Sequence, residues 1–180
     1  MSDLIVRPRQ ASDLQAAGEA LVDVYRTDGY PVEGVADPVA WLMPKGLIAS
    51  WIAELDSEIV GHVAIGAPKP DDDAVRLWLE QSDDKLDDVA VIGRLFVKSS
   101  ARRNSVGEKL ARAAVTDQAV AGKTLVLDVM DKDQDAIRLY ERLGLEKIGE
   151  ATHSFGEGQS ITAYCYVVPK ELVYSRPAES

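Results

Sequence analysis

Apolar residues along this chain follow two spacings, one typical of strands and one typical of helices. Short apolar and partly β-branched runs predict strands at residues 4–8, 47–55, 59–67, 91–97, 125–129, 146–153 and 160–168. Spacings of three to four residues predict helices at 11–25, 106–114 and 136–143. Proline after Asp37 opens a short helix at 38–41, and 74–81 could form another short helix. Strands and helices are interspersed, so the pattern indicates a mixed α and β protein.

The most informative segment joins the strand that ends at Val97 to the helix that begins at Val106. The N–H groups at the start of a helix are unpaired and carry a partial positive charge, so they attract anions. Arginine adds charge-assisted hydrogen bonds that suit phosphate. The connection carries Arg102, Arg103, Asn104, Ser105 and Gly107. We therefore predict that a phosphate-bearing ligand binds here.

A second segment runs from the strand at 125–129 into the helix at 136–143. Its apolar face carries Tyr140 among alanine and leucine side chains, and Gly144 is placed to end the helix. Asp131 and Asp133 precede the helix, and either carboxylate can cap its first turn.

Together the two segments resemble motifs A and B of the GCN5-related N-acetyltransferases, the GNAT superfamily. Motif A, Arg/Gln-x-x-Gly-x-Gly/Ala, here reads Arg102-x-x-Ser105-x-Gly107. Motif B, Asn-x-x-Ala-x-x-Leu-Tyr-x-x-x-Gly-Phe, begins at Asp133 and ends at Leu145. Serine replaces the first glycine of motif A, which is costly only if that residue adopts a positive φ. The motifs cover residues 89–150, and the rest of the chain matches by element order.

The resemblance implies an α/β (α+β) fold. Its centre would be a mixed, mostly antiparallel twisted sheet of about seven strands, flanked by about four helices and splayed at the acetyl-CoA site. We expect one domain over residues 1–168, with an acidic, solvated insertion at about 70–88 and a frayed tail at 169–180.

The resemblance also implies acetyl transfer from acetyl-CoA to a primary amine of a small molecule or peptide. The amine attacks directly, without a covalent enzyme intermediate. Tyr140 would protonate the departing thiolate as a general acid, although a helix-face tyrosine can also be a core aromatic. Residues assigned to acetyl-CoA in this way are Leu95, Phe96, Val97, Arg102, Arg103, Asn104, Ser105, Val106, Gly107, Glu108, Asp133, Ala136 and Tyr140.

The general base is not fixed by the resemblance. Many relatives carry a glutamate on the motif A strand where this chain has Gly93 and Arg94. Glu33 and His62 are candidates, and their alternatives are a surface turn and a hydrogen-bonded strand histidine. Asp128 and His153 are further possibilities. The candidate acceptor site comprises Asp28, Tyr30 and Glu33.

The net charge of the chain limits the classes of molecule that it is expected to bind. The formal net charge is −10, from 20 Lys and Arg against 30 Asp and Glu, which argues against a nucleic-acid surface. The acidity would steer a cationic amine or simply keep the protein soluble. The non-catalytic alternative is an acyl-CoA-binding or regulatory domain on the same fold.

One cysteine and two histidines provide neither a disulfide nor a zinc ligand set, so we expect no metal. The sequence shows no signal peptide and no membrane-spanning run, which predicts a cytoplasmic protein without a membrane partner. A homodimer is a further expectation, because members of this family are often dimers.

Overall fold

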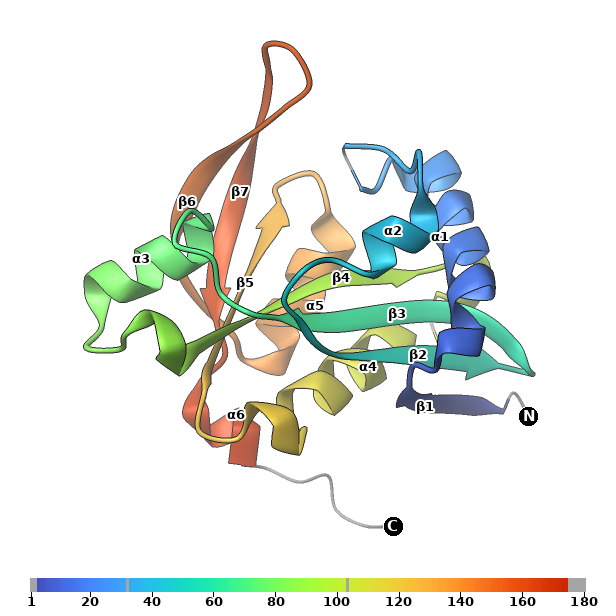
Figure 1. The fold of residues 1–180 in the computed structure, drawn as a ribbon, viewed down its shortest axis with the longest axis horizontal. Coiled ribbons are helices and arrows are strands. Elements are labelled where there is room, and N and C mark those ends of the chain that lie inside the picture. Colours follow the sequence, from blue (N-terminus) through green and yellow to red (C-terminus); the bar gives the residue numbers. More distant parts are fainter. Residues whose placement is uncertain (1–2, 32, 103, 175–180) are drawn as a thin grey trace. The chain divides into compact units, whose positions relative to one another are not determined.

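The structure is a computed structural model that describes residues 3–31, 33–102 and 104–174 (Figure 1). The chain forms two compact units. The first unit consists of Met1–Ile65 and Arg94–Ala114, and the second consists of Gly66–Gly93 and Val115–Ser180. Strand β4 (Val89–Val97) begins in the second unit and ends in the first. This strand therefore carries the chain from one unit to the other.

The first unit is a strand layer with helices on both faces. Its strands follow the order β1-β2-β3-β4, and β1 is antiparallel to β2. Besides the end of β4, its elements are β1 (Leu4–Pro8), α1 (Leu14–Asp28), α2 (Pro38–Leu42), β2 (Leu47–Leu55), β3 (Glu58–Gly66) and α4 (Val106–Val115). A 3-10 turn, Ala11–Asp13, leads into α1.

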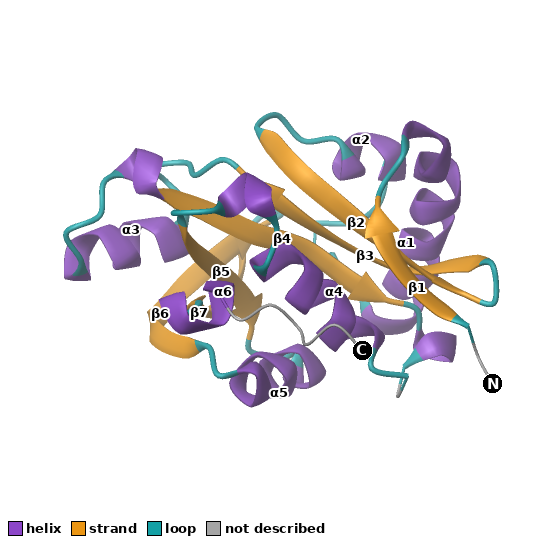
Figure 2. Cartoon of the chain, turned by 90° about the horizontal axis from the view of Figure 1, so that it is seen from below, coloured by secondary structure: helices purple, strands orange, loops and turns teal. Residues whose placement is uncertain are grey.

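Two neighbouring residues of β3 show how this layer is covered. His62 stacks on Phe96, which packs with Leu21 of α1 and Leu42 of α2 in one buried cluster. Gly61 faces the other way, and a Cβ at this position would meet Leu110 of α4 at 2.9 Å. Successive strand residues point to opposite faces, so α1 and α2 cover one face and α4 the other (Figure 2). Glycine at position 61 allows the close approach of α4.

The second unit has the strand order β4-β5-β7-β6. β4 runs parallel to β5, while the pairs β5–β7 and β6–β7 are antiparallel. Its further elements are α3 (Asp73–Gln81), β5 (Thr124–Met130), α5 (Gln134–Leu143), β6 (Glu146–Phe155), β7 (Gln159–Val167) and α6 (Lys170–Tyr174). The seven strands form one mixed sheet, and this confirms the predicted fold class.

The acidic segment is less solvated than its composition predicts. Helix α3 buries Ala74 and Val75 in a cluster with Val126 of β5 and Cys165 of β7. Asp84 accepts hydrogen bonds from Trp78 Nε1 at 2.8 Å and from Thr124 Oγ1 at 2.7 Å. These two bonds lower the pKa of Asp84. The segment therefore covers one face of the second unit's strands.

The predicted tail also needs a correction. Residues 170–174 form the short helix α6, and the cap of α5 at Gly144 lies near Leu172. Counting α6 and the short α2, the described residues form six α-helices rather than about four. Five of the six lie at predicted positions, and α6 is too short to show the repeated apolar spacing by which a sequence reveals a helix. The single-domain boundary at residue 168 stays a prediction.

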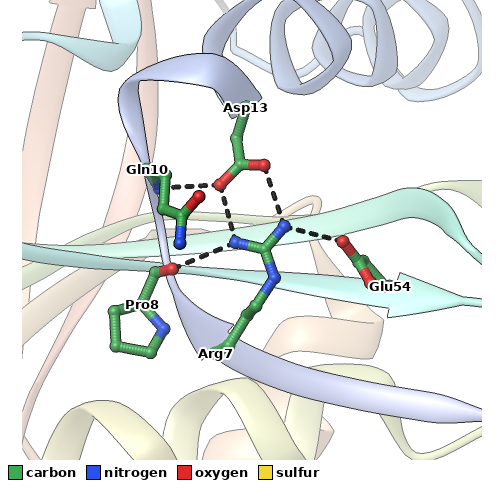
Figure 3. A network of polar contacts seen from close by, with 5 residues as sticks. All are labelled: Arg7, Pro8, Gln10, Asp13 and Glu54. Carbon is green, nitrogen blue, oxygen red and sulfur yellow. Dashed lines mark hydrogen bonds and ion pairs between the residues drawn. The ribbon is translucent and has the colours of Figure 1, made fainter.

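An arginine-centred network fixes the start of the first unit (Figure 3). Arg7 of β1 donates two hydrogen bonds to the carboxylate of Asp13, at 2.8 and 2.9 Å, and a third to Glu54 of β2 at 2.6 Å. Asp13 also accepts the backbone N–H of Gln10 at 2.7 Å. Its side chain is 8% exposed, so solvent screens these contacts weakly. The network joins β1, β2 and the turn before α1.

We expect Asp13→Asn to lower the free energy of unfolding by about 2 kcal/mol at pH 7, because an amide cannot accept both arginine bonds. The bonds from Arg7 lower the pKa of Asp13 in the folded protein below its ordinary value of 3.8. The stabilisation is therefore present above that ordinary value and disappears as the pH falls through the lower folded value. Urea unfolding of both proteins at pH 7 and under acid conditions measures this.

Glu19→Gln, at an exposed position of α1, is the control for losing one carboxylate. An Asp13→Asn cost no larger than the cost of Glu19→Gln would contradict a stabilising role of the network.

Candidate functional site

The loop between β4 and α4 has a left-handed residue directly before the helix. After the 3-10 turn Ser99–Ala101, Ser105 adopts a φ of 60°. Its carbonyl accepts the N–H of Lys109 at 3.1 Å, so α4 starts directly after it. A left-handed conformation costs a non-glycine residue about 1 kcal/mol or more. The serine at the first glycine position of the motif is therefore strained.

Arg102 makes a contact that the sequence did not predict. Its guanidinium forms an ion pair with Asp28, at the end of α1, and donates to the carbonyl of Val97 at 3.2 Å. The structure thus joins a predicted cofactor residue to a predicted acceptor residue. A phosphate bound to Arg102 would compete with Asp28 for the same guanidinium. Arg103 lies outside the described residues, and Asn104 Nδ2 donates to the carbonyl of Ala101 at 3.0 Å.

The residues predicted to bind the pantetheine and pyrophosphate parts of acetyl-CoA lie at the end of β4 and the start of α4. The parallel ladder between β4 and β5 joins Val89–Val91 to Thr124–Val126, while β4 continues to Val97. Leu95 and Val97 are half-buried, and Phe96 between them is buried. Helix α4 begins with Val106, Gly107 and Glu108, whose N–H groups precede the first complete helical turn. Backbone donors and acceptors of this kind match a pantetheine amide and a phosphate.

In the second unit, Tyr140 lies on the buried face of α5. Its side chain packs against Tyr166, with 6.1 Å between the ring centroids. Burial raises the pKa of Tyr140, and the negative charges of Asp128 and Asp133 raise it further. Within the described part of the chain, the Tyr140 hydroxyl has no hydrogen-bond partner. The phenol therefore stays protonated at neutral pH and has a proton to donate.

Asp133 holds the first turn of α5 through its backbone. It occupies the N-cap position, and its carbonyl accepts the N–H of Ile137 at 3.1 Å. Its side chain makes no capping hydrogen bond, which corrects the predicted carboxylate cap. Ala136 lies in the same turn and is half-buried. At the other end, Gly144 has a φ of 89° and closes the helix as predicted.

His62 is held between two arginines. Arg9 Nη1 lies 2.9 Å from His62 Nε2, and the carbonyl of Arg94 lies 3.0 Å from Nδ1. A guanidinium only donates and a carbonyl only accepts, so His62 is neutral and carries its proton on Nδ1. The side chain is completely buried, and this burial lowers the pKa of His62 to about 4. Both ring nitrogens are engaged, which argues against His62 as the base.

Two of the three predicted acceptor residues, Tyr30 and Glu33, meet around Trp41. The ring of Tyr30 packs edge-on against Trp41, with 5.9 Å between centroids, and Trp41 Nε1 donates to Glu33 at 3.1 Å. Arg94 Nε donates to the carbonyl of Trp41 at 2.8 Å, and its guanidinium carbon lies 4.9 Å from the Trp41 ring centroid. Tyr30 and Glu33 thus lie together, whereas Asp28 is held by Arg102.

A sequence model described as the Acetyltransferase (GNAT) family matches residues 18–145. The chain belongs to the GNAT acetyltransferase family. The match begins within α1 and includes the motif A loop and α5, so it covers parts of both units. No curated protein matched the sequence.

Solved structures of GNAT proteins share this fold at low sequence identity. An N-acetyltransferase from Staphylococcus aureus Mu50 is 16% identical, with a TM-score of 0.69, and the match covers 92% of this chain and 98% of that one. Arabidopsis thaliana NAA60 in complex with acetyl-CoA is 20% identical, with a TM-score of 0.67 and coverage of 92% and 98%. The ribosomal-protein-S18-alanine N-acetyltransferase from Escherichia coli is 13% identical, with a TM-score of 0.64 and coverage of 99% of both chains.

Within this GNAT protein, sequence reasoning missed the contacts of Arg94 with Trp41. Arg94 interrupts an apolar strand, and this was the one available clue. Among the described residues, no cluster of His, Cys, Asp and Glu could hold a metal ion. None of the described helices has the length and apolar character needed to cross a membrane.

We expect Ser105→Gly to stabilise this GNAT protein by about 1 kcal/mol, because glycine adopts the positive φ without strain. Greater freedom of glycine in the unfolded chain offsets part of this gain. The corresponding rise in melting temperature is about 2–4 °C for a protein of this size. Calorimetric melting measures it.

Ser100→Gly is the matched control, because Ser100 lies in the same loop and does not have a positive φ. It should lower the melting temperature. A Ser105→Gly protein that melts at or below the temperature of the Ser100→Gly protein would contradict the strain at Ser105.

Proposed function

We propose that this GNAT protein is an N-acetyltransferase that transfers the acetyl group of acetyl-CoA to a primary amine of a small molecule or peptide. The observation that carries the proposal is the Tyr140 hydroxyl, which is protonated at neutral pH, as an ordinary phenol is, and has no hydrogen-bond partner in the described chain. The motif A loop supports it, because α4 starts directly after Ser105 as a phosphate-binding turn requires.

The reaction follows from these groups. The neutral amine nitrogen attacks the thioester carbonyl carbon, and a new C–N bond forms as the C–S bond breaks. The departing thiolate takes the proton of the Tyr140 hydroxyl. The amine loses its proton to a base, and the products are the acetamide and CoA. Backbone N–H groups at the end of β4 can stabilise the developing oxyanion.

Glu33 is the base that we retain. It is exposed, its carboxylate is held by one hydrogen bond from Trp41, and the second oxygen remains open to solvent or to an amine. His62 is set aside because it is buried and both of its ring nitrogens have partners. Asp128 is exposed on β5, so it remains a second candidate for proton acceptance through water. The side chain of His153 is not among those that the structure describes.

A non-catalytic acyl-CoA-binding domain is the second candidate function. The observations in its favour are the strained Ser105 and the arginine at position 94, where many relatives carry a glutamate. Tyr140 favours the enzyme, because a binding domain has no need of a buried acid. Cytoplasmic location and homodimer formation remain our predictions.

The proposal is tested by following CoA thiol release from acetyl-CoA with a panel of primary amines. The panel contains diamines, amino acids, their carboxamides and short peptides with free N-termini. We expect amine-dependent thiol release, with an acetylated product of 42 Da added mass detected by mass spectrometry. Saturable acetyl-CoA binding without turnover on any amine would favour the binding domain.

We expect Tyr140→Phe to reduce kcat on the order of a hundredfold, because the thiolate then departs without a proton donor. The Kd for acetyl-CoA should change little, since the aromatic ring is retained. Steady-state kinetics and calorimetric titration measure the two quantities.

Tyr166→Phe is the control, because Tyr166 is a second buried tyrosine whose ring packs against Tyr140. It should retain most of the turnover. Equal kcat for the wild type and the Tyr140→Phe variant would remove Tyr140 from the acid role.

A further inference from the structure

Arg94 has an unusual backbone and a fixed side chain. Four non-glycine residues in the described chain have a positive φ: Asp56 and Ser57 form the hairpin turn, Ser105 starts α4, and Arg94, at 53°, lies within a strand. Strain inside a strand persists only where surrounding contacts hold it, and such strain is concentrated at functional sites. Here the holding contacts are the bond from His62 to the Arg94 carbonyl and the bond from Arg94 Nε to Trp41.

The end of the Arg94 guanidinium is left without a carboxylate partner. Its Nε is bonded to a carbonyl and its plane lies over Trp41, while its two terminal nitrogens have no partner in the described chain. The side chain is only partly buried. A guanidinium fixed at Nε presents its remaining N–H groups as a fork that matches a carboxylate in two parallel hydrogen bonds.

A second arginine adds to this local positive charge. Arg9 donates to the carbonyl of Leu42 at 2.8 Å, to the sulfur of Met43 at 3.0 Å and to His62 at 2.9 Å. All three partners are neutral. In a chain with a formal net charge of −10, two arginines without an ion pair therefore flank the end of α2.

A negative charge lies at another edge of the same tryptophan. Glu33 accepts from Trp41 Nε1 at 3.1 Å, whereas Arg94 lies over the ring face. Trp41 thus carries a carboxylate on its edge and a guanidinium on its face. A ligand that bears both an ammonium and a carboxylate complements this pair of charges.

From this arrangement we infer that the acceptor is an amine that also carries a carboxylate, such as a free amino acid, with its carboxylate bound by Arg94 and its amine beside Glu33. The inference rests on the proposed acetyltransferase function and defines the substrate class. The total charge left two roles open, steering of a cationic amine and solubility, whereas Arg94 beside Trp41 favours an acceptor that also carries a carboxylate. A purely structural role, in which Arg94 caps the end of α2, explains the hydrogen bond from Nε to the Trp41 carbonyl. It does not explain why the two terminal nitrogens have no partner in the described chain.

The test compares alanine, methionine and phenylalanine with their carboxamides as acceptors, for the wild type and for Arg94→Ala, Arg94→Lys and Arg76→Ala. We expect the wild type to favour the amino acids in kcat/KM by about ten- to a hundredfold. Arg94→Ala should lose that preference, so that its kcat/KM values for the acids and the carboxamides become equal, and a cooperative melting transition checks that the variant is folded. Arg94→Lys should retain a small part of the preference. Arg76→Ala, which removes an exposed arginine of α3, should keep the full preference.

Equal rates for acids and carboxamides, a preference for the carboxamides, or a preference that survives in Arg94→Ala would each overturn the inference. Titration with N-acetylalanine and its amide, in the presence of CoA, tests carboxylate binding without turnover. If no amine is acetylated but N-acetylalanine binds through Arg94, the proposed function fails and the carboxylate site stands. If amines are acetylated and the acid binds no better than the amide, the proposed function stands and the inference fails.

Discussion

The left-handed backbone at Arg94 is the constraint on which the candidate acceptor site depends. It turns the middle of β4 out of regular strand geometry, at a cost of about 1–2 kcal/mol. His62 donates its Nδ1 proton to the Arg94 carbonyl and accepts from Arg9 at Nε2, and the second contact requires a neutral ring. Complete burial keeps the ring neutral, since it lowers the pKa of His62 to about 4. The neutral His62 ring thus connects Arg9 to the turn in the strand.

The same contacts set the position of the loop that follows α1. Arg9 and Arg94 bind the last carbonyls of α2, and Trp41 connects this short helix to Tyr30 and Glu33. Phe96, one of the residues predicted to lie along the pantetheine, packs against both Trp41 and His62. A change in the packing of this cluster would therefore reach both the predicted cofactor edge of β4 and the acceptor loop.

Sequence reasoning was most successful where a local pattern determines the structure. The strands at 4–8 and 47–55 were predicted to the residue, and Gly144 ends α5 as expected, because a short apolar run and a left-handed glycine are local signals. The family was also predicted correctly from the motifs around Ser105 and Tyr140. The roles of the individual site residues remain predictions.

What the sequence did not reveal depends on contacts between distant residues. An exposed histidine has a pKa near neutrality and could act as the general base. Only the burial of His62 between Arg9 and Arg94 argues against that catalytic role. The ion pair between Arg102 and Asp28 joins residues that are 74 positions apart, so no local sequence pattern predicts it. Likewise, the burial of α3 depends on its packing against β5 and β7, whereas its acidic composition indicated solvent.

Calorimetric titration with acetyl-CoA and with CoA shows whether the loop before α4 binds this cofactor, although Ser105 and Asp133 depart from the motifs. We expect saturable binding of both ligands with one site per chain. We also expect weaker binding of both when Arg102 is replaced by alanine. If the wild type binds neither ligand, the site is not functional and the acetyltransferase proposal is contradicted.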